Sequence, residues 1–177
     1  AVKAVKARYY LWIGEKAEAL KYAKEVIDAQ NTDIVIEQKF RLADESYVAA
    51  GNLTMRREHI MAIQNPQLES IIKPVFINTG GLTQTVAKVN DVYEKTLHPN
   101  DIRNASERYW AEKALPTSTS KQNMFKKYWA SESTSVKIIP LIRVAEMYMI
   151  VMECGTLTQA QEAFKEYRIS RNMDATV

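Results

Sequence analysis

Hydrophobic residues recur every three to four positions in two stretches, one near each end of the chain. In residues 1–30, one such stripe precedes Gly14 and another follows it. The first comprises Ala4, Ala7, Tyr10 or Leu11, and Ile13, and the second comprises Ala19, Leu20, Ala23, Val26 and Ile27. This spacing predicts two amphipathic helices that form a hairpin. The aromatic residues on the first stripe, Tyr9, Tyr10 and Trp12, are predicted to be packing residues.

The second stretch, residues 138–171, predicts another helical hairpin. Apolar residues cover nearly the whole circumference of residues 141–154, which is typical of a buried helix. Pro140 predicts the start of that helix, because the first amides of a helix have no intrahelical partner and proline has no amide hydrogen. Gly155 predicts its end. A second helix follows, with Thr156 or Thr158 as its candidate cap and with a partner-facing stripe of Ala160, Ala163, Phe164 and Tyr167.

The buried helix carries three charged residues, Arg143, Glu146 and Glu153. Their spacing places them on one stripe, and they interrupt the apolar run before it is long enough to span a bilayer. We therefore expect a core helix and not a membrane helix. Ionised groups on a crowded helix persist when they are paired or hydrogen-bonded, so we expect these charges to have structural partners.

The two hairpins share one internal signal. Gly14 precedes Ala19 by the same interval at which Gly155 precedes Ala160. A glycine permits a left-handed turn, and an alanine on the second helix leaves room for aromatic side chains of the facing helix. This arrangement resembles the tetratricopeptide hairpin, although repeats of that type follow one another at about 34 residues and these two lie much farther apart.

The region between the hairpins, residues 31–137, is less regular and is predicted to be a loop-rich insertion with one or two helices and at most short strands. Thr79-Gly80-Gly81 is a predicted loop. The other expected elements are a short helix in Phe40–Ala50, a strand at His59–Gln64, an extended segment at Ser70–Asn78, a helix at Thr83–Leu97 and a flexible loop at Leu115–Gln122.

Composition limits the class of protein. With 177 residues, 46% hydrophobic, and only five Gly and five Pro, the chain can bury a substantial core as one mostly α-helical domain. Its formal charge is +3 and no long basic run is present, so nucleic acid is not an expected partner. The single cysteine, Cys154, provides no disulfide framework.

No catalytic, cofactor or metal pattern is found in the sequence. The two histidines, His59 and His98, lie outside any HExxH motif, and there is no cysteine cluster to complete a zinc site. The glycine pair at residues 80–81 lacks the spacing of either nucleotide fingerprint. We therefore predict a protein that is not an enzyme, with no cofactor and no metal.

Several motifs in order resemble the SusD/RagB family of outer-membrane nutrient-binding lipoproteins. After the first hairpin, the matching elements are Glu58–Asn65 (EHIMAIQN), Asp101-Ile102-Arg103, Lys127-Tyr128, the helix with Pro140, Arg143, Ala145, Glu146, Tyr148 and Glu153, and the Arg-x-x-Arg pair Arg168 and Arg171. Two positions depart from the family pattern. Lys165 stands where asparagine is frequent, and Asn172 stands where alanine or glycine is common. These departures affect local turn geometry.

The resemblance implies a non-catalytic, cell-surface scaffold of tetratricopeptide-like hairpins. Members are lipid-anchored outside the outer membrane, where they pass oligosaccharides, polysaccharides or other nutrients to a SusC-like TonB-dependent transporter. The chain starts without an initiator Met or an apolar leader, so we expect residues 1–177 to be a fragment of one such domain, with its signal and anchor cysteine outside it. The alternative is a helical-repeat scaffold that binds a protein or peptide partner, and a helical hydrolase ranks last.

A sugar-binding site needs a flat ring for the apolar face of the sugar and planar polar groups for its hydroxyls. In the insertion, the candidate ligand-binding residues are Tyr109, Trp110, Tyr128, Trp129 and Asn123, near Asn104, Arg108 and Gln122. A core packing role is the competing interpretation of each ring, since a tryptophan flanked by alanine more often fills a core.

Overall fold

The computed structural model describes residues 1–31, 40–68, 70–71, 100–103, 109–114, 121–125 and 137–174. The chain forms two compact units. The first comprises Ala1–Asp44, Met55–Ile63 and Pro140–Val177, and the second comprises Glu45–Thr54 and Gln64–Ile139.

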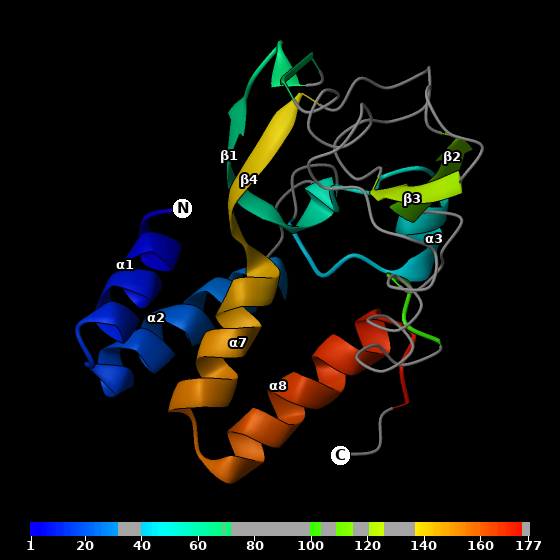
Figure 1. Cartoon of the computed structure of the whole chain (residues 1–177). Helices are drawn as coiled ribbons and strands as arrows, with labels where there is room; N and C mark the ends of the chain where they lie inside the picture. Colours follow the sequence, from blue (N-terminus) through cyan, green and yellow to red (C-terminus); the bar gives the residue numbers. More distant parts are fainter. Residues whose placement is uncertain are drawn as a thin grey trace. The chain divides into compact units, whose positions relative to one another are not determined.

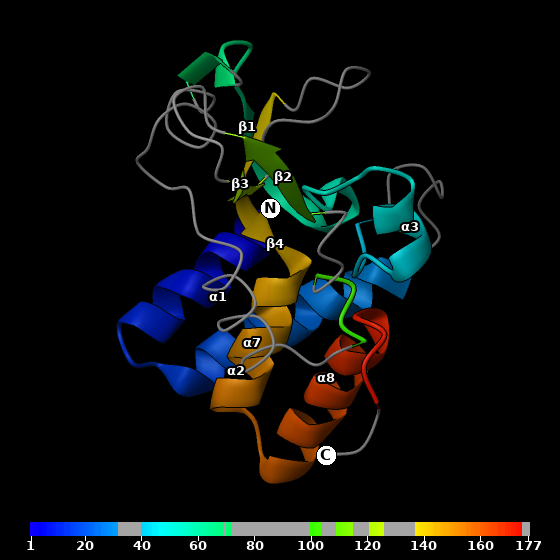
Figure 2. The same ribbon diagram turned by 45° about the vertical axis from the view of Figure 1, so that its right-hand side comes forward.

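In the described residues of the first unit, four α-helices pack in chain order (Figures 1 and 2). They are α1 (Val2–Trp12), α2 (Lys16–Asp28), α7 (Val144–Cys154) and α8 (Leu157–Ser170). Helix α1 packs on α2, α2 on α7, and α7 on α8, while α1 also reaches α7. A short 3-10 helix, η1 (Ala29–Asn31), extends α2. The predicted mostly α-helical class and its hairpins are therefore confirmed.

Small residues bring the helices of the first unit close together. Ala4 and Ala7 of α1 and Ala19 and Ala23 of α2 have no exposed surface. The same core contains larger side chains from residues 142–151, namely Ile142, Val144, Met147, Tyr148, Ile150 and Val151, together with Ala163 of α8. Alanine at a helix crossing lets the two axes approach, and the larger side chains fill the remaining space. The predicted inward face of each hairpin is thus largely as observed.

The prediction for the aromatic residues of α1 is partly wrong. Tyr10 does pack, because its ring stacks on that of Tyr22 with centroids 5.6 Å apart and planes 7° apart. Tyr9 and Trp12, however, are 56% and 88% exposed. The helix turns its alanine face toward α2, which carries Tyr9 and Trp12 round to the outer side. Ile13, also expected to be inward, is exposed as well.

The predicted helix start at Pro140 is also wrong. Residues Ile138–Arg143 form strand β4, and α7 begins only at Val144. Strand β4 pairs with β1 (His59–Gln64), which has the bounds that the sequence predicts. Proline is compatible with a short two-stranded sheet, and it favours extended backbone at the residue before it. Pairing with a distant strand therefore decides the conformation of Pro140.

The glycines of the two hairpins act by different physical means. Gly14 has φ +82°, the left-handed turn that the sequence predicts. Gly155 has φ −81° and ψ 172°, so the left-handed turn predicted for it is wrong. A Cβ at Gly155 would lie 2.7 Å from the carbonyl oxygen of Val151, and this close approach explains the glycine. Thr156 then caps α8 in a capping box with Gln159, as predicted for one of the two candidate threonines.

Short elements make up the remainder of the described chain. They are α3 (Glu45–Ala49), the 3-10 helix η3 (Arg56–Glu58), and the antiparallel strands β2 (Trp110–Ala114) and β3 (Lys121–Phe125). The helix expected in Phe40–Ala50 is present but shorter. Lys121 and Gln122 belong to β3 and not to the expected loop, and Ser70 is helical and not extended. The predictions for residues 72–78, 79–81, 83–97 and 115–120 lie outside the described residues.

Candidate functional site

Two of the candidate sugar-binding residues lie on one two-stranded antiparallel sheet of the second unit. Trp110 begins β2 and is paired with Phe125, while Asn123 of β3 is paired with Glu112. Tryptophan and phenylalanine favour strands, and paired strands lie about 4.8 Å apart. The register therefore holds the backbones of Trp110 and Asn123 near each other.

Tyr109 directly precedes this sheet and is 4% exposed. A ring that stacks against a sugar must present a face to solvent. The burial of Tyr109 therefore favours a packing role beside Trp110 over a role as an open platform. Tyr128 and Trp129 lie outside the described residues, as do their neighbours Asn104 and Arg108 of the sequence analysis.

The Asp-x-Arg element of the second unit forms a closed local turn. Asp101 is buried, and its carboxylate accepts hydrogen bonds from the backbone amide of Arg103 at 2.8 Å and from its Nε at 2.9 Å. A second guanidinium nitrogen, Nη2, lies 2.5 Å from Oδ2. Asp101 and Arg103, two residues apart, thus form an ion pair within the turn. This element therefore has a structural role.

The most constrained polar cluster belongs to the first unit and joins segments that are distant in sequence. Glu58, at the end of η3, is 0% exposed, and Arg171, just after α8, is 1% exposed. Arg171 donates from Nη2 to Glu58 Oε1 at 2.5 Å and from Nη1 to the carbonyl of Ala43 at 2.8 Å. The amide of Ala43 donates to the same Oε1 at 2.9 Å. Both charged groups are therefore paired and hydrogen-bonded in the interior.

Two further contacts complete this cluster. The guanidinium carbon of Arg171 lies 4.8 Å from the centroid of the Tyr167 ring, a cation–π distance. Arg143, at the start of α7, places Nη1 3.9 Å from Glu58 Oε2. The Coulomb attraction of Glu58 raises the pKa of Arg171 against the opposing effect of burial. The cluster ties the end of α8 to η3, to the segment before α3 and to the start of α7.

The sequence analysis singled out Arg171 in the Arg-x-x-Arg pair but did not identify its partner. Glu58 ends a charged run, Arg56-Arg57-Glu58, and such runs usually face solvent. The available signals were its place at the start of the Glu58–Asn65 motif and its position directly before an apolar strand, and neither indicates a partner. Glu58 Oε2 and Arg171 Nε are buried without a hydrogen-bond partner among the described residues, so the pair is not fully satisfied. Because both side chains are sealed from solvent and form an ion pair, this cluster holds segments together and is closed to a substrate.

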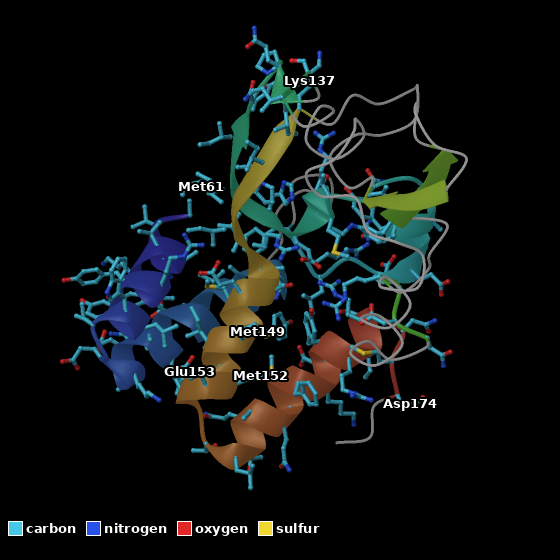
Figure 3. All side chains as sticks on the ribbon, in the orientation of Figure 1. Met61, Lys137, Met149, Met152, Glu153 and Asp174 are labelled. Carbon is cyan, nitrogen blue, oxygen red and sulfur yellow. The ribbon has the colours of Figure 1, made fainter. Side chains whose placement is uncertain are left out.

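The three charges that the sequence placed on one helix do have partners, although Arg143 ends β4 and only Glu146 and Glu153 lie on α7. Arg8 of α1 contacts both carboxylate oxygens of Glu146, each at 2.6 Å, and its Nη2 also donates to the carbonyl of Leu141. Glu153, near the end of α7 (Figure 3), lies 3.8 Å from Lys16 of α2. Arg143 faces Glu58 as described. The structural interpretation of this stripe is confirmed.

Two titratable side chains of the second hairpin, Tyr148 and Cys154, have raised pKa values that favour their neutral forms. The Tyr148 hydroxyl donates to Glu166 at 2.9 Å and accepts from Gln30 Nε2 at 3.3 Å, and burial raises its pKa to about 12. Burial also raises the pKa of the Cys154 thiol, which disfavours the nucleophilic thiolate at neutral pH. Neither group has the lowered pKa of an activated nucleophile.

Metal donors do not converge in the described part of the chain. Among those residues, no group of three or more His, Cys, Asp or Glu side chains could hold a metal ion. His59 begins β1, and His98 lies outside the described ranges. Within the same residues, every helix is too short or too polar to cross a lipid bilayer.

Comparison with known proteins identifies a structural relative. No protein-family model and no curated protein matches the sequence. The structure is similar to the crystal structure of a SusD superfamily protein from Bacteroides vulgatus, with a TM-score of 0.68 and 18% sequence identity. The match covers 97% of this chain and 40% of that chain, so the present chain spans less than half the length of its relative. The chain has a SusD-like fold.

Proposed function

We propose that this chain is part of a non-catalytic, cell-surface glycan-binding protein of the SusD type, which delivers oligosaccharides to a SusC-like TonB-dependent transporter. The similarity to a SusD superfamily structure over 97% of the chain carries this proposal. The order of sequence motifs, from Glu58–Asn65 to the Arg-x-x-Arg pair, supports it independently. A lipid anchor on the outer membrane belongs to the same proposal.

The structural roles of the charged residues support a binding function without catalysis. Glu58, Glu146 and Glu153 each lie against a basic side chain. Glycosidase chemistry needs two carboxyl groups across an open cleft, one of them able to give up a proton. These three carboxylates are instead committed to ion pairs within the helical unit.

The sugar is proposed to bind at the insertion. Trp110 and Asn123 lie on paired strands and supply the two chemical groups that such a site needs, a flat ring and a planar amide. Tyr128 and Trp129 are proposed to contact the sugar as well. Tyr109 is buried, so it is proposed to pack in the second unit and not to stack on the sugar.

Affinity electrophoresis against a panel of soluble polysaccharides, followed by isothermal titration calorimetry, tests the proposal. We expect at least one glycan to bind saturably and Trp110→Ala or Trp129→Ala to weaken binding tenfold or more, since stacking aromatic side chains dominate such contacts. Trp12→Ala is the matched control, because it removes an exposed indole from α1. Equal losses in all three variants would place the site elsewhere, and no binding to any glycan would contradict the proposal.

One observation favours the alternative function, a scaffold for a protein partner. Helix α1 exposes a row of large apolar side chains that includes Tyr9 and Trp12. Exposed apolar surface of this kind marks interaction sites. Binding of a protein helix at α1 and of a glycan at the insertion would be compatible functions of one SusD-like protein.

A further inference from the structure

The outer face of α1 has the pattern of a helix-packing seam. Val2, Val5, Tyr9 and Trp12 are 71%, 45%, 56% and 88% exposed, and they are spaced by three, four and three residues. This is the spacing of successive a and d positions in a heptad repeat, where apolar side chains face a second helix. These four residues are called the α1 seam, and the half-exposed Ile13 lies beside its end.

At the opposite end of the helical stack, the terminal helix has a polar outer face. Helix α8 is the last helix of the stack (Figure 1), and its exposed positions include Thr158, Gln161, Glu162, Lys165 and Glu166. Its exposed apolar residues, Leu157 and Ile169, stand singly near its two ends. Terminal helices of repeat proteins need such a polar outer face. The outer face of α1 is the apolar seam and not a polar surface, so it resembles the surface of an interior helix.

The charged residues beside the seam indicate which kind of helix it favours as a partner. Helix α1 has no acidic residue, and Lys6 and Arg8 occupy the positions that flank the seam, corresponding to e and g of the heptad. Two copies of α1 would bring these basic residues against each other in either orientation, which disfavours self-association. A helix with acidic flanks would instead place carboxylates beside Lys6 and Arg8.

Both basic side chains are held in place by contacts inside the unit. Arg8 is paired with Glu146, and Lys6 Nζ lies 5.0 Å from the centroid of the Tyr22 ring. Both remain exposed. A partner carboxylate would therefore meet two ordered basic side chains along the edges of the seam, which lowers the entropy cost of pairing. Lys6 supplies the larger share of the attraction, because Glu146 already compensates the charge of Arg8.

We propose that the α1 seam is the docking site for an amphipathic partner helix that has a seam of small and aliphatic residues flanked by Asp or Glu. Inside the unit, α1 meets α2 through alanines such as Ala19 and Ala23. The partner needs similarly small residues opposite Trp12, because a large side chain there would hold the helices apart. The proposal concerns a surface separate from the proposed glycan site and does not depend on it.

Synthetic helical peptides of about three heptads test the proposal. One has Ala and Leu at a and d with Glu at e and g, and its matched control has Lys at e and g. Calorimetric titration into the full chain is expected to show binding of the acidic peptide at least tenfold tighter than of the basic one. Trp12→Ser should weaken that binding at least tenfold, while Leu157→Ser, which removes an exposed leucine from α8, should leave it unchanged.

Three results would overturn the proposal. They are equal affinity for both peptides, no binding of either at about 1 mM, and binding that Trp12→Ser does not change. Light scattering provides a further test of the occupant. A dimer of the chain that Trp12→Ser converts to monomer would assign the seam to a second copy and would also overturn the proposal. Glycan binding by Trp12→Ser is expected to equal that of the unmodified chain, so the two proposals fail separately.

Discussion

Replacing Arg171 by methionine tests the role of the buried Glu58–Arg171 pair. The change keeps an unbranched apolar side chain but removes the guanidinium, and with it the bonds to Glu58 at 2.5 Å and to the Ala43 carbonyl at 2.8 Å. Glu58 then keeps the Ala43 amide and, at 3.9 Å, Arg143. Its buried carboxylate loses its closest cation.

The expected cost follows from the burial of both partners. Removing one partner of a buried ion pair costs about 3–5 kcal/mol, because the remaining charge is left without compensation. Arg143 still offers Glu58 a weaker interaction, which favours the lower part of that range. Since a domain of this size is stable by about 5–15 kcal/mol, this is a large share of the free energy of unfolding.

Urea unfolding followed by circular dichroism measures this cost, with three further variants for comparison: Arg168→Met, Glu58→Met and the double variant Glu58→Met/Arg171→Met. Arg168→Met is the matched control from the same Arg-x-x-Arg pair. The partly exposed Arg168 side chain has no ion-pair partner among the described residues; it donates to the carbonyl of Asp174 at 2.6 Å and lies 5.4 Å from the centroid of the Phe164 ring. We expect that variant to lose about 1 kcal/mol, the net value of one hydrogen bond. The double variant Glu58→Met/Arg171→Met should be more stable than Arg171→Met, because it removes the uncompensated charge.

Two outcomes would refute this reasoning. One is a loss below about 1 kcal/mol in Arg171→Met, which is what an exposed pair would give. The other is a double variant whose loss equals the sum of the two single losses, which would mean that the residues act independently. If Arg171→Met does not fold, a folded double variant would still support the account, and an unfolded one would contradict it.

The remaining predictions concern single positions in the first unit. Gly155→Ala should destabilise the protein by about 1–3 kcal/mol through overpacking, because the new Cβ would lie 2.7 Å from the Val151 carbonyl oxygen. In Gly14→Ala the new Cβ meets no atom within 4 Å, but the residue keeps φ +82°, so the change should cost only about 1–2 kcal/mol. In urea unfolding, a smaller loss of stability in Gly155→Ala than in Gly14→Ala would contradict the explanation. The raised pKa of Tyr148 predicts a contribution to stability that is complete below pH 10, the usual pKa of an unfolded tyrosine, and is lost as the pH rises to about 12. Between pH 9 and a pH above 11, the free energy of unfolding of the unmodified protein should therefore fall more steeply than that of Tyr148→Phe. Equal slopes for the two proteins would refute this explanation.

Local periodicity was sufficient to predict the helices of both hairpins and strand β1. The alanine stripes of α1 and α2 determine which faces meet, and Thr156 with Gln159 marks the start of α8 within the sequence itself. Each of these features depends on residues only a few positions apart, which is the range over which sequence patterns are informative.

Long-range contacts explain what the sequence did not predict. Pro140 is in a strand because β4 pairs with β1, and Glu58 is buried because Arg171, 113 residues later, reaches it. The outward position of Trp12 follows from which face of α1 is taken by α2. For the candidate site, the pairing register relates Trp110 to Asn123, and no local pattern indicates that Tyr109 is buried.

Calorimetric titration of the glycan identified by affinity electrophoresis is the most direct test of the proposed function. We predict saturable binding of the glycan to the protein, a loss of affinity of tenfold or more in Trp110→Ala, and unchanged affinity in Trp12→Ala. The absence of heat with every glycan in the panel, or an equal loss of affinity in both variants, would contradict a glycan site at the β2–β3 sheet.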